Sequence, residues 1–220
     1  MTEKLQRMKK QQLNAEMFAE LRDWDQQSFR ERLERLNFLH GLTTPPEKGW
    51  SVPGGLIGFA AFWEAERCFI GGNFVSTVML IQTFVEHSLA DILARLKYRV
   101  RRLSFQRLID KALNMGELTP SLAKQLHKLR QLRNPYAHPN MDVWPTPYFK
   151  RVMSDAGGNS YALHEADARY AIRVAASYIR QIANRWDPLL QANHEYKDPL
   201  HAMTIDGDKY PITDFWIFRK

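Results

Sequence analysis

Cysteine is almost absent from this chain, which has only Cys68 among 220 residues. A single cysteine excludes a disulfide within the chain and fits a reducing compartment. Cys68 also lies in an apolar helical pattern, which argues against a thiol nucleophile. We therefore expect a cytoplasmic protein whose stability does not depend on disulfides.

The motifs of common metal and nucleotide sites are missing as well. The sequence contains no Cys-x2-Cys pair, no His-Glu-x2-His and no carboxylate cluster at ligand spacing. No glycine-rich phosphate loop follows a strand, and no strand pattern is strong anywhere. Acid–base chemistry by histidine remains open, so we expect no cofactor and no metal.

No apolar run is long enough for a transmembrane helix. Residues 56–81 are the most apolar window, but three charged residues and Gly71-Gly72 interrupt them. The first ten residues lack the apolar core of a signal peptide. Negative charge is also in deficit, since the formal net charge is +7. This balance favours an acidic partner, with nucleic acid first and a membrane surface second. Of these we expect an RNA substrate and no membrane partner.

Apolar residues recur at helical spacing, so we expect an all-α fold. The patterns predict helices over residues 56–70, 74–96, 105–116, 120–134 and 166–186. Residues 1–42 predict two helices that separate near Asp23-Trp24-Asp25, with Ser28 and Glu31 as a capping box for the second. Residues 139–161 predict a long loop because proline is frequent at its start.

The proline pair in Thr43-Thr44-Pro45-Pro46 predicts a linker. It divides the chain into an N-terminal helical extension with its linker (1–46), a helical bundle (47–190) and a C-terminal tail (191–220). The tail ends in an aromatic segment that is too apolar to hang free. We expect this segment to dock on the bundle or on a second protomer.

One predicted helix ends in an unusual polar segment, Arg133-Asn134-Pro135-Tyr136-Ala137-His138. Thr119 is the expected N-cap of this helix and Pro120 its first residue. Leu122, Leu126 and Leu129 define a buried stripe, and Arg133 continues it four residues later. Because a residue before proline disfavours the α region, we expect the helix to end at Asn134-Pro135 and His138 to lie one turn on. An inward guanidinium is costly unless it is paired or faces a site.

Arg133-Asn134, with four residues between Arg133 and His138, resembles the Arg-(Asn/His/Asp)-x(3–5)-His signature of HEPN domains. These helical bundles occur in many prokaryotic ribonucleases, toxins and antiviral effectors. The resemblance covers about residues 56–187 and includes Glu86 on an upstream helix. It implies a HEPN-like up-and-down bundle and a homodimer whose two motifs form one composite site. It also implies a metal-independent endoribonuclease that acts as a toxin or antiviral defence effector.

RNA supplies its own nucleophile, the 2′-hydroxyl, so the protein needs a proton handler and a cation. Histidine, with an ordinary pKa of about 6.5, suits the first role. On the resemblance, His138 handles the proton, Arg133 stabilises phosphate charge, Asn134 fixes the geometry and Glu86 orients Arg133. A structural alternative pairs Arg133 with a buried carboxylate such as Glu86 and leaves His138 in a loop.

Partners remain open at this point. The resemblance allows a protein that neutralises or activates the enzyme. The HEPN toxins that are regulated by nucleotidylylation carry a tyrosine two residues after the motif histidine. Asn140 stands there in this chain, so we expect no nucleotidyltransferase antitoxin. The alternative function is a catalytically inactive HEPN-like module that binds RNA or a protein.

A basic run follows the helix predicted over residues 74–96. The run suits phosphate binding, with Tyr98 and Phe105 available for base stacking. The alternative is a solvated helix end with cations at its favourable pole. The predicted RNA-binding residues are Arg95, Lys97, Arg99, Arg101 and Arg102.

A second arginine–histidine pair with the same spacing occurs at Arg35 and His40. Leu36, Leu39 and Phe29 hold the apolar face of this helix. We therefore expect a solvated Arg35 and a His40 that lies near the helix C-terminus, rather than a second site.

Overall fold

The computed structural model describes residues 2–42, 53–138, 145–186, 202–205 and 208–211, with side chains placed for residues 12–42, 53–138 and 145–182. The chain divides into two compact units, Met1–Gly41 and Leu42–Lys220. The boundaries predicted at residues 46 and 190 lie outside the described residues, as do the end of the tail and its expected docking.

The N-terminal unit is formed by one continuous helix, α1 (Thr2–Leu42), so the prediction of two helices is wrong. Asp25 pairs with Arg32 over 2.6 Å, and the Ser28 hydroxyl donates to the Asp25 carbonyl over 3.1 Å. These polar residues make contacts within the helix instead of ending it. No proline or glycine occurs between residues 2 and 40 to interrupt the hydrogen bonds.

The second arginine–histidine pair also differs from expectation. The Arg35 side chain is buried and forms an ion pair with Glu31 over 2.5 Å, so the expectation of a solvated Arg35 is wrong. His40 is exposed in the last turn of α1, as predicted.

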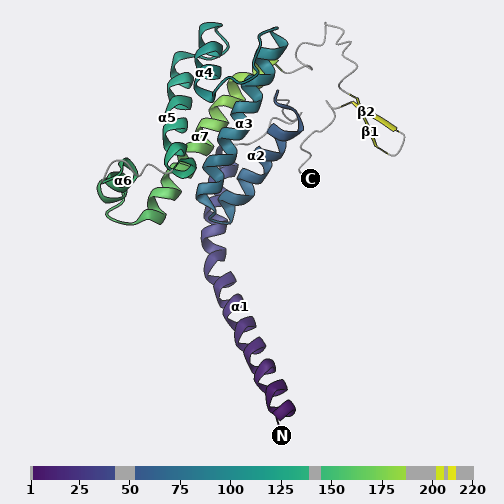
Figure 1. Ribbon diagram of the computed structural model, residues 1–220, viewed down its shortest axis with the longest axis vertical. Coiled ribbons are helices and arrows are strands. Elements are labelled where there is room, and N and C mark those ends of the chain that lie inside the picture. Colours follow the sequence, from purple (N-terminus) through teal and green to yellow (C-terminus); the bar gives the residue numbers. More distant parts are fainter. Residues whose placement is uncertain (1, 43–52, 139–144, 187–201, 206–207, 212–220) are drawn as a thin grey trace. The chain divides into compact units, whose positions relative to one another are not determined.

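Six helices make up most of the described part of the second unit (Figure 1). The central one, α3, packs against α2, α4, α5 and α7. The predicted all-α class is therefore confirmed for this bundle. The helices are α2 (Gly55–Ile70), α3 (Phe74–Arg95), α4 (Phe105–Asn114), α5 (Pro120–Ala137), α6 (Pro147–Asp155) and α7 (Ser160–Trp186).

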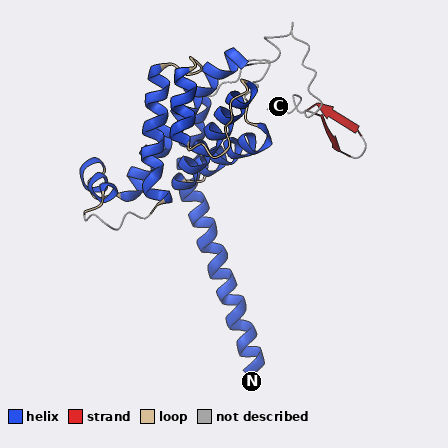
Figure 2. Ribbon diagram, turned by 45° about the horizontal axis from the view of Figure 1, so that its top comes forward, coloured by secondary structure: helices blue, strands red, loops and turns tan. Residues whose placement is uncertain are grey.

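A short antiparallel hairpin follows the helices and was not predicted from the sequence (Figure 2). It pairs β1 (Ala202–Ile205) with β2 (Asp208–Pro211), with Ala202 opposite Pro211.

The core of the bundle consists of the predicted apolar stripes. Fully buried side chains recur every three or four residues along α3, and Leu126 and Leu129 of α5 and Ile182 of α7 are fully buried as well. Within this core the Tyr178 hydroxyl donates to the Ser88 hydroxyl over 2.8 Å, which satisfies a buried polar group. The buried stripe of α3 comprises Phe74, Val78, Ile81, Val85, Leu89 and Ile92.

Pro147 begins a helix inside the segment that the sequence predicted as a loop. Thr146 caps α6 by accepting from the backbone N–H of Phe149 over 3.1 Å, and Pro147 is the first helical residue. The last helix, α7, begins at Ser160, earlier than the predicted start at Ala166. The predicted long loop is therefore interrupted by α6 and ends earlier than expected, at the start of α7. No helix in the described part of the chain is long and apolar enough to cross a membrane.

Candidate functional site: the arginine–histidine pair at the end of α5

The predicted motif residues Arg133, Asn134 and His138 come together at the C-terminal end of α5. The helix continues through Pro135 to Ala137, so the expectation that it ends at Asn134-Pro135 is wrong. A proline in the last turn removes its own N–H bond and crowds the carbonyl four residues earlier, and the helix ends two residues after Pro135. The backbone N–H of His138 donates to the carbonyl of Asn134 over 2.9 Å, which places His138 as the C-cap.

This backbone path places the His138 ring beside the Arg133 guanidinium. The Arg133 Nη1 atom lies 3.2 Å from His138 Nε2. A guanidinium can only donate, so Nε2 accepts and the proton of the neutral ring lies on Nδ1 in this arrangement. His138 is exposed and Arg133 is half-buried, at the end of the buried leucine stripe. The pair therefore combines a basic nitrogen with a fixed cation at the surface.

Glu86 lies half-buried on α3. Among the described residues, no hydrogen bond or ion pair joins Glu86 to Arg133 or His138. The Arg133 guanidinium instead contacts the ring of His138. The structural alternative of an Arg133–Glu86 pair is therefore not the arrangement seen here. The orienting role of Glu86 stays a prediction.

A carboxylate that sequence reasoning missed ties the motif to two other helices. Asp167 of α7 is only 3% exposed, and it accepts from the hydroxyl of Tyr136 over 2.9 Å. It also binds Arg151 of α6 through two hydrogen bonds of 2.5 and 3.1 Å. The hydrogen bond to Asp167 raises the pKa of Arg151. Burial, then the nearby carboxylate, raises the pKa of Tyr136, so both donors stay protonated near neutral pH.

Two aromatic side chains complete this network. The Tyr148 hydroxyl lies 2.6 Å from His164 Nε2, and the His164 ring stands edge-on to Tyr136 with centroids 5.4 Å apart. We call Tyr136, Tyr148, Arg151, His164 and Asp167 the Asp167 cluster. It joins the last turn of α5 to α6 and α7.

The sequence carries one signal for this cluster. Asp167 lies four residues before Ala171, on the buried stripe that continues through Val174 and Tyr178. A carboxylate on a buried stripe requires partners, which points to a structural or functional network.

The His164 ring gives a prediction for the pH dependence of stability. Burial lowers the pKa of His164, so protonation is favoured in the unfolded chain. The stabilisation from the neutral ring is present above its ordinary pKa of about 6.5 and is lost as the pH falls through the lower folded value. We expect the melting temperature to fall more steeply between about pH 7 and pH 5 in the wild type than in His164→Gln. Parallel pH profiles for the two proteins would contradict this origin.

The basic run lies on the turn between α3 and α4. Lys97, Arg99, Arg101 and Arg102 are exposed. Arg95 instead pairs with Asp91 over 3.1 Å.

The two aromatic residues proposed for base stacking, Tyr98 and Phe105, differ in solvent exposure. Tyr98 is 40% exposed, and the Lys111 ammonium lies 4.1 Å from the centroid of its ring. Phe105 is buried, with 5% exposure, so its expected role in base stacking is wrong.

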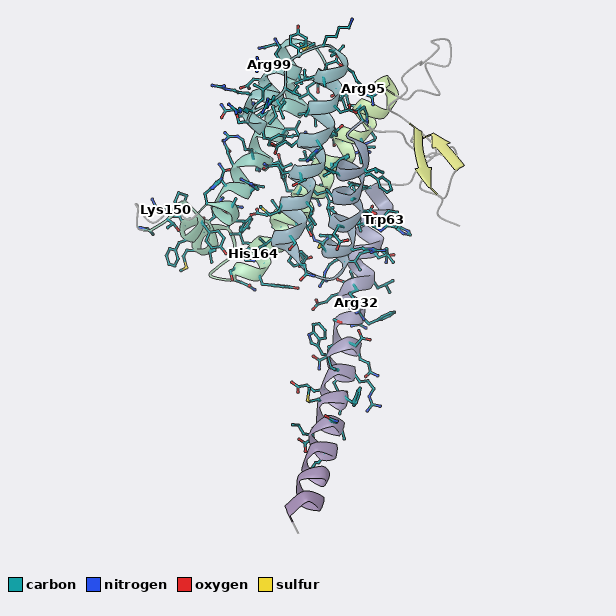
Figure 3. The ribbon with its side chains drawn as sticks, turned by 45° about the vertical axis from the view of Figure 1, so that its right-hand side comes forward. Arg32, Trp63, Arg95, Arg99, Lys150 and His164 are labelled. Carbon is teal, nitrogen blue, oxygen red and sulfur yellow. The ribbon has the colours of Figure 1, made fainter. Side chains whose placement is uncertain are left out.

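The basic run and the motif occupy different ends of the bundle. Figure 3 shows Arg95 and Arg99 at one end and His164 with Lys150 at the other. His164 belongs to the motif end because its ring contacts Tyr136. The structure therefore brings Arg133, Asn134 and His138 together but does not bring the predicted RNA-binding residues to them.

Other candidate chemistry is limited in the residues that the structure describes. No group of three or more histidine, cysteine, aspartate or glutamate side chains there could hold a metal ion. Burial, then the charge of Glu64, raises the pKa of the Cys68 thiol, which makes it a poorer nucleophile.

Comparison of the chain with protein-family models, curated proteins and solved structures finds no match. Fold and site together define a helical bundle with an arginine–histidine pair at a helix end. The resemblance to HEPN domains continues to depend on the motif residues.

Proposed function

We propose that this protein is a metal-independent endoribonuclease with a HEPN-like bundle, acting as a toxin or antiviral defence effector. The observation that carries the proposal is the 3.2 Å contact between Arg133 Nη1 and His138 Nε2. His138 is exposed to solvent, and it carries its lone pair on Nε2. A base and a cation at one surface point are the two groups that attack by the 2′-hydroxyl on phosphorus needs.

In this mechanism His138 Nε2 takes the proton of the 2′-hydroxyl, and the 2′-oxygen attacks the adjacent phosphorus. The bond from phosphorus to the 5′-oxygen of the next nucleotide breaks, and that oxygen receives a proton from an imidazolium. The products are a 2′,3′-cyclic phosphate and a 5′-hydroxyl. Arg133 leaves Nε2 and donates to the non-bridging phosphate oxygens, where negative charge develops. Asn134 holds the turn that sets the two side chains against each other.

A homodimer fits this chemistry better than a single copy. One histidine must accept a proton and an imidazolium must donate one to the opposite side of the phosphorus. Two motifs facing each other across a two-fold axis would supply a base and an acid in one composite site. The exposure of His138 and the partial exposure of Arg133 leave these groups accessible to a second copy.

The alternative is a catalytically inactive module that binds RNA or a protein. The same contact favours it, because Arg133 occupies the nitrogen that would accept the substrate proton. Such a module would bind RNA in a salt-dependent way and leave it intact.

The test is incubation of the full chain with an end-labelled RNA, once with EDTA and once with Mg²⁺. We expect cleavage at equal rates in both, because the proposed chemistry uses no metal. Cleavage that EDTA abolishes would contradict the mechanism. Binding with intact RNA across several substrates would favour the inactive module.

A further inference from the structure

The turn between α3 and α4 contains two residues in an unfavourable backbone conformation. Lys97 has φ of 62° and Arg102 has φ of 67°. They are the two non-glycine residues with positive φ in the described part of the chain. Side chains with a Cβ rarely adopt this left-handed region, so both positions carry local strain.

Each of these residues lies where glycine is the usual choice. The N–H of Lys97 donates to the carbonyl of Ala94 over 2.8 Å, and the N–H of Tyr98 donates to that of Leu93 over 2.9 Å. These two bonds form a Schellman motif, whose left-handed position is most often glycine. Arg102 is the third residue of a turn closed by the bond from Leu103 N–H to the Val100 carbonyl over 3.0 Å. A positive φ there also favours glycine or asparagine.

The strained residues belong to a patch of one charge sign. Lys97, Arg99, Arg101 and Arg102 are exposed, and none of their side chains forms a hydrogen bond or ion pair with another residue in the described part of the chain. The sequence has no aspartate or glutamate between Ile92 and Ile109. Glycine at two of these positions would relieve the strain but remove two of the charges. The turn thus has charged residues at two positions where the backbone conformation favours glycine. Backbone strain of this kind is typical of functional surfaces.

We propose that residues 97–102 form a distal phosphate-binding surface that holds the backbone of RNA away from the cleavage site. This inference rests on the proposed ribonuclease function and deepens it. The cations contact phosphates and carry no sequence information of their own. The surface therefore selects for the length of the substrate rather than for its sequence.

The geometry sets the minimum length of that substrate. The 18 residues of α5 end at the motif, and at ~1.5 Å per residue the helix is ~27 Å long. Arg99 and His164 lie toward opposite ends of the bundle (Figure 3). An RNA that reaches both surfaces must span on the order of 25 Å, which is roughly seven steps of a stacked strand at ~3.4 Å per nucleotide and fewer steps of an extended one. An RNA of about three nucleotides can occupy the motif but is too short to reach the turn as well, even when its strand is extended.

The test compares RNA binding and stability in the double variant Lys97→Gly/Arg102→Gly. Binding is measured in full-length protein that also carries His138→Ala, so that the RNA stays intact. With a 30-nucleotide RNA, we expect affinity to fall about tenfold and the slope of log K against log salt to shrink by roughly 1.4 to 1.8. With a three-nucleotide RNA, affinity should not change. The melting temperature should rise by about 2–4 °C as the strain is relieved.

Two further variants separate charge from strain. Arg99→Ala/Arg101→Ala should weaken binding of the long RNA without raising the melting temperature. Arg22→Ala/Arg30→Ala removes the same charge from exposed positions of α1 and should leave the affinity unchanged.

An unchanged affinity and salt slope in Lys97→Gly/Arg102→Gly would overturn the inference, as would an equal loss in the α1 control. Binding does not require cleavage, so a wild type that binds but does not cut RNA would refute only the ribonuclease proposal. Cleavage by the wild type with no effect of the turn variants would refute only the distal surface.

Discussion

Replacing His138 or Arg133 with alanine is expected to lower the rate of RNA cleavage by about 10³-fold while the protein stays folded. His138→Ala removes the only nitrogen that the mechanism uses to accept the 2′-hydroxyl proton. Arg133→Ala removes the cation that meets the developing phosphate charge. Neither side chain is buried in the core, so thermal unfolding should shift little. Single-turnover cleavage rates and melting curves measure the two effects separately.

His127→Ala is the matched control for this experiment. His127 lies on the same helix and pairs with Asp110 over 3.0 Å, away from the motif. We expect this variant to cleave RNA at the wild-type rate. Full activity in His138→Ala, or an equal loss in His127→Ala, would exclude His138 as the proton handler.

Asp167→Asn is expected to destabilise the protein by about 2–3 kcal/mol. The substitution removes the negative charge that two donors share, and the amide cannot accept from both sides of the Arg151 fork. The loss is smaller than for a fully buried ion pair because 28% of the Arg151 side chain is exposed. Urea unfolding near neutral pH measures the difference in the free energy of unfolding. We expect the loss of α6 docking to lower cleavage as well, since Tyr136 lies inside the motif.

Asp110→Asn provides the comparison for this second prediction. Asp110 also loses an ion pair, but half of its side chain is exposed and its partner is His127. A change of less than about 1 kcal/mol is expected there. Similar small losses in both variants would show that the Asp167 cluster does not hold the motif end together.

Local patterns in the sequence predicted most of the bundle. The helical spacing of apolar residues in α3 and the N-cap Thr119 depend on residues within one or two turns of each other, and both are seen. The wrong predictions concern residue types that are common in two different kinds of local structure. Ser28 resembles a cap but lies inside α1, and Pro147 resembles a loop residue but begins α6.

The candidate site was partly predictable for the same reason. Arg133 and His138 are five residues apart at a helix end, so their approach is a local property of the chain. The Asp167 cluster is not local, because Asp167 is 31 residues from Tyr136 and 16 from Arg151 in sequence. The location of the basic turn far from the motif likewise depends on how α3, α4 and α5 pack. Neither the Asp167 cluster nor the location of the basic turn can be predicted from the spacing of residues along the chain.

The most direct test of the proposed mechanism is the chemistry of the new ends in RNA cleaved in EDTA. Attack by the 2′-hydroxyl predicts a 2′,3′-cyclic phosphate on one fragment and a 5′-hydroxyl on the other, which mass spectrometry of the fragments distinguishes. A 2′-deoxy nucleotide at the cleaved position should then block the reaction. Fragments with a 3′-hydroxyl and a 5′-phosphate would show that water is the nucleophile and would contradict the role assigned to the Arg133–His138 pair.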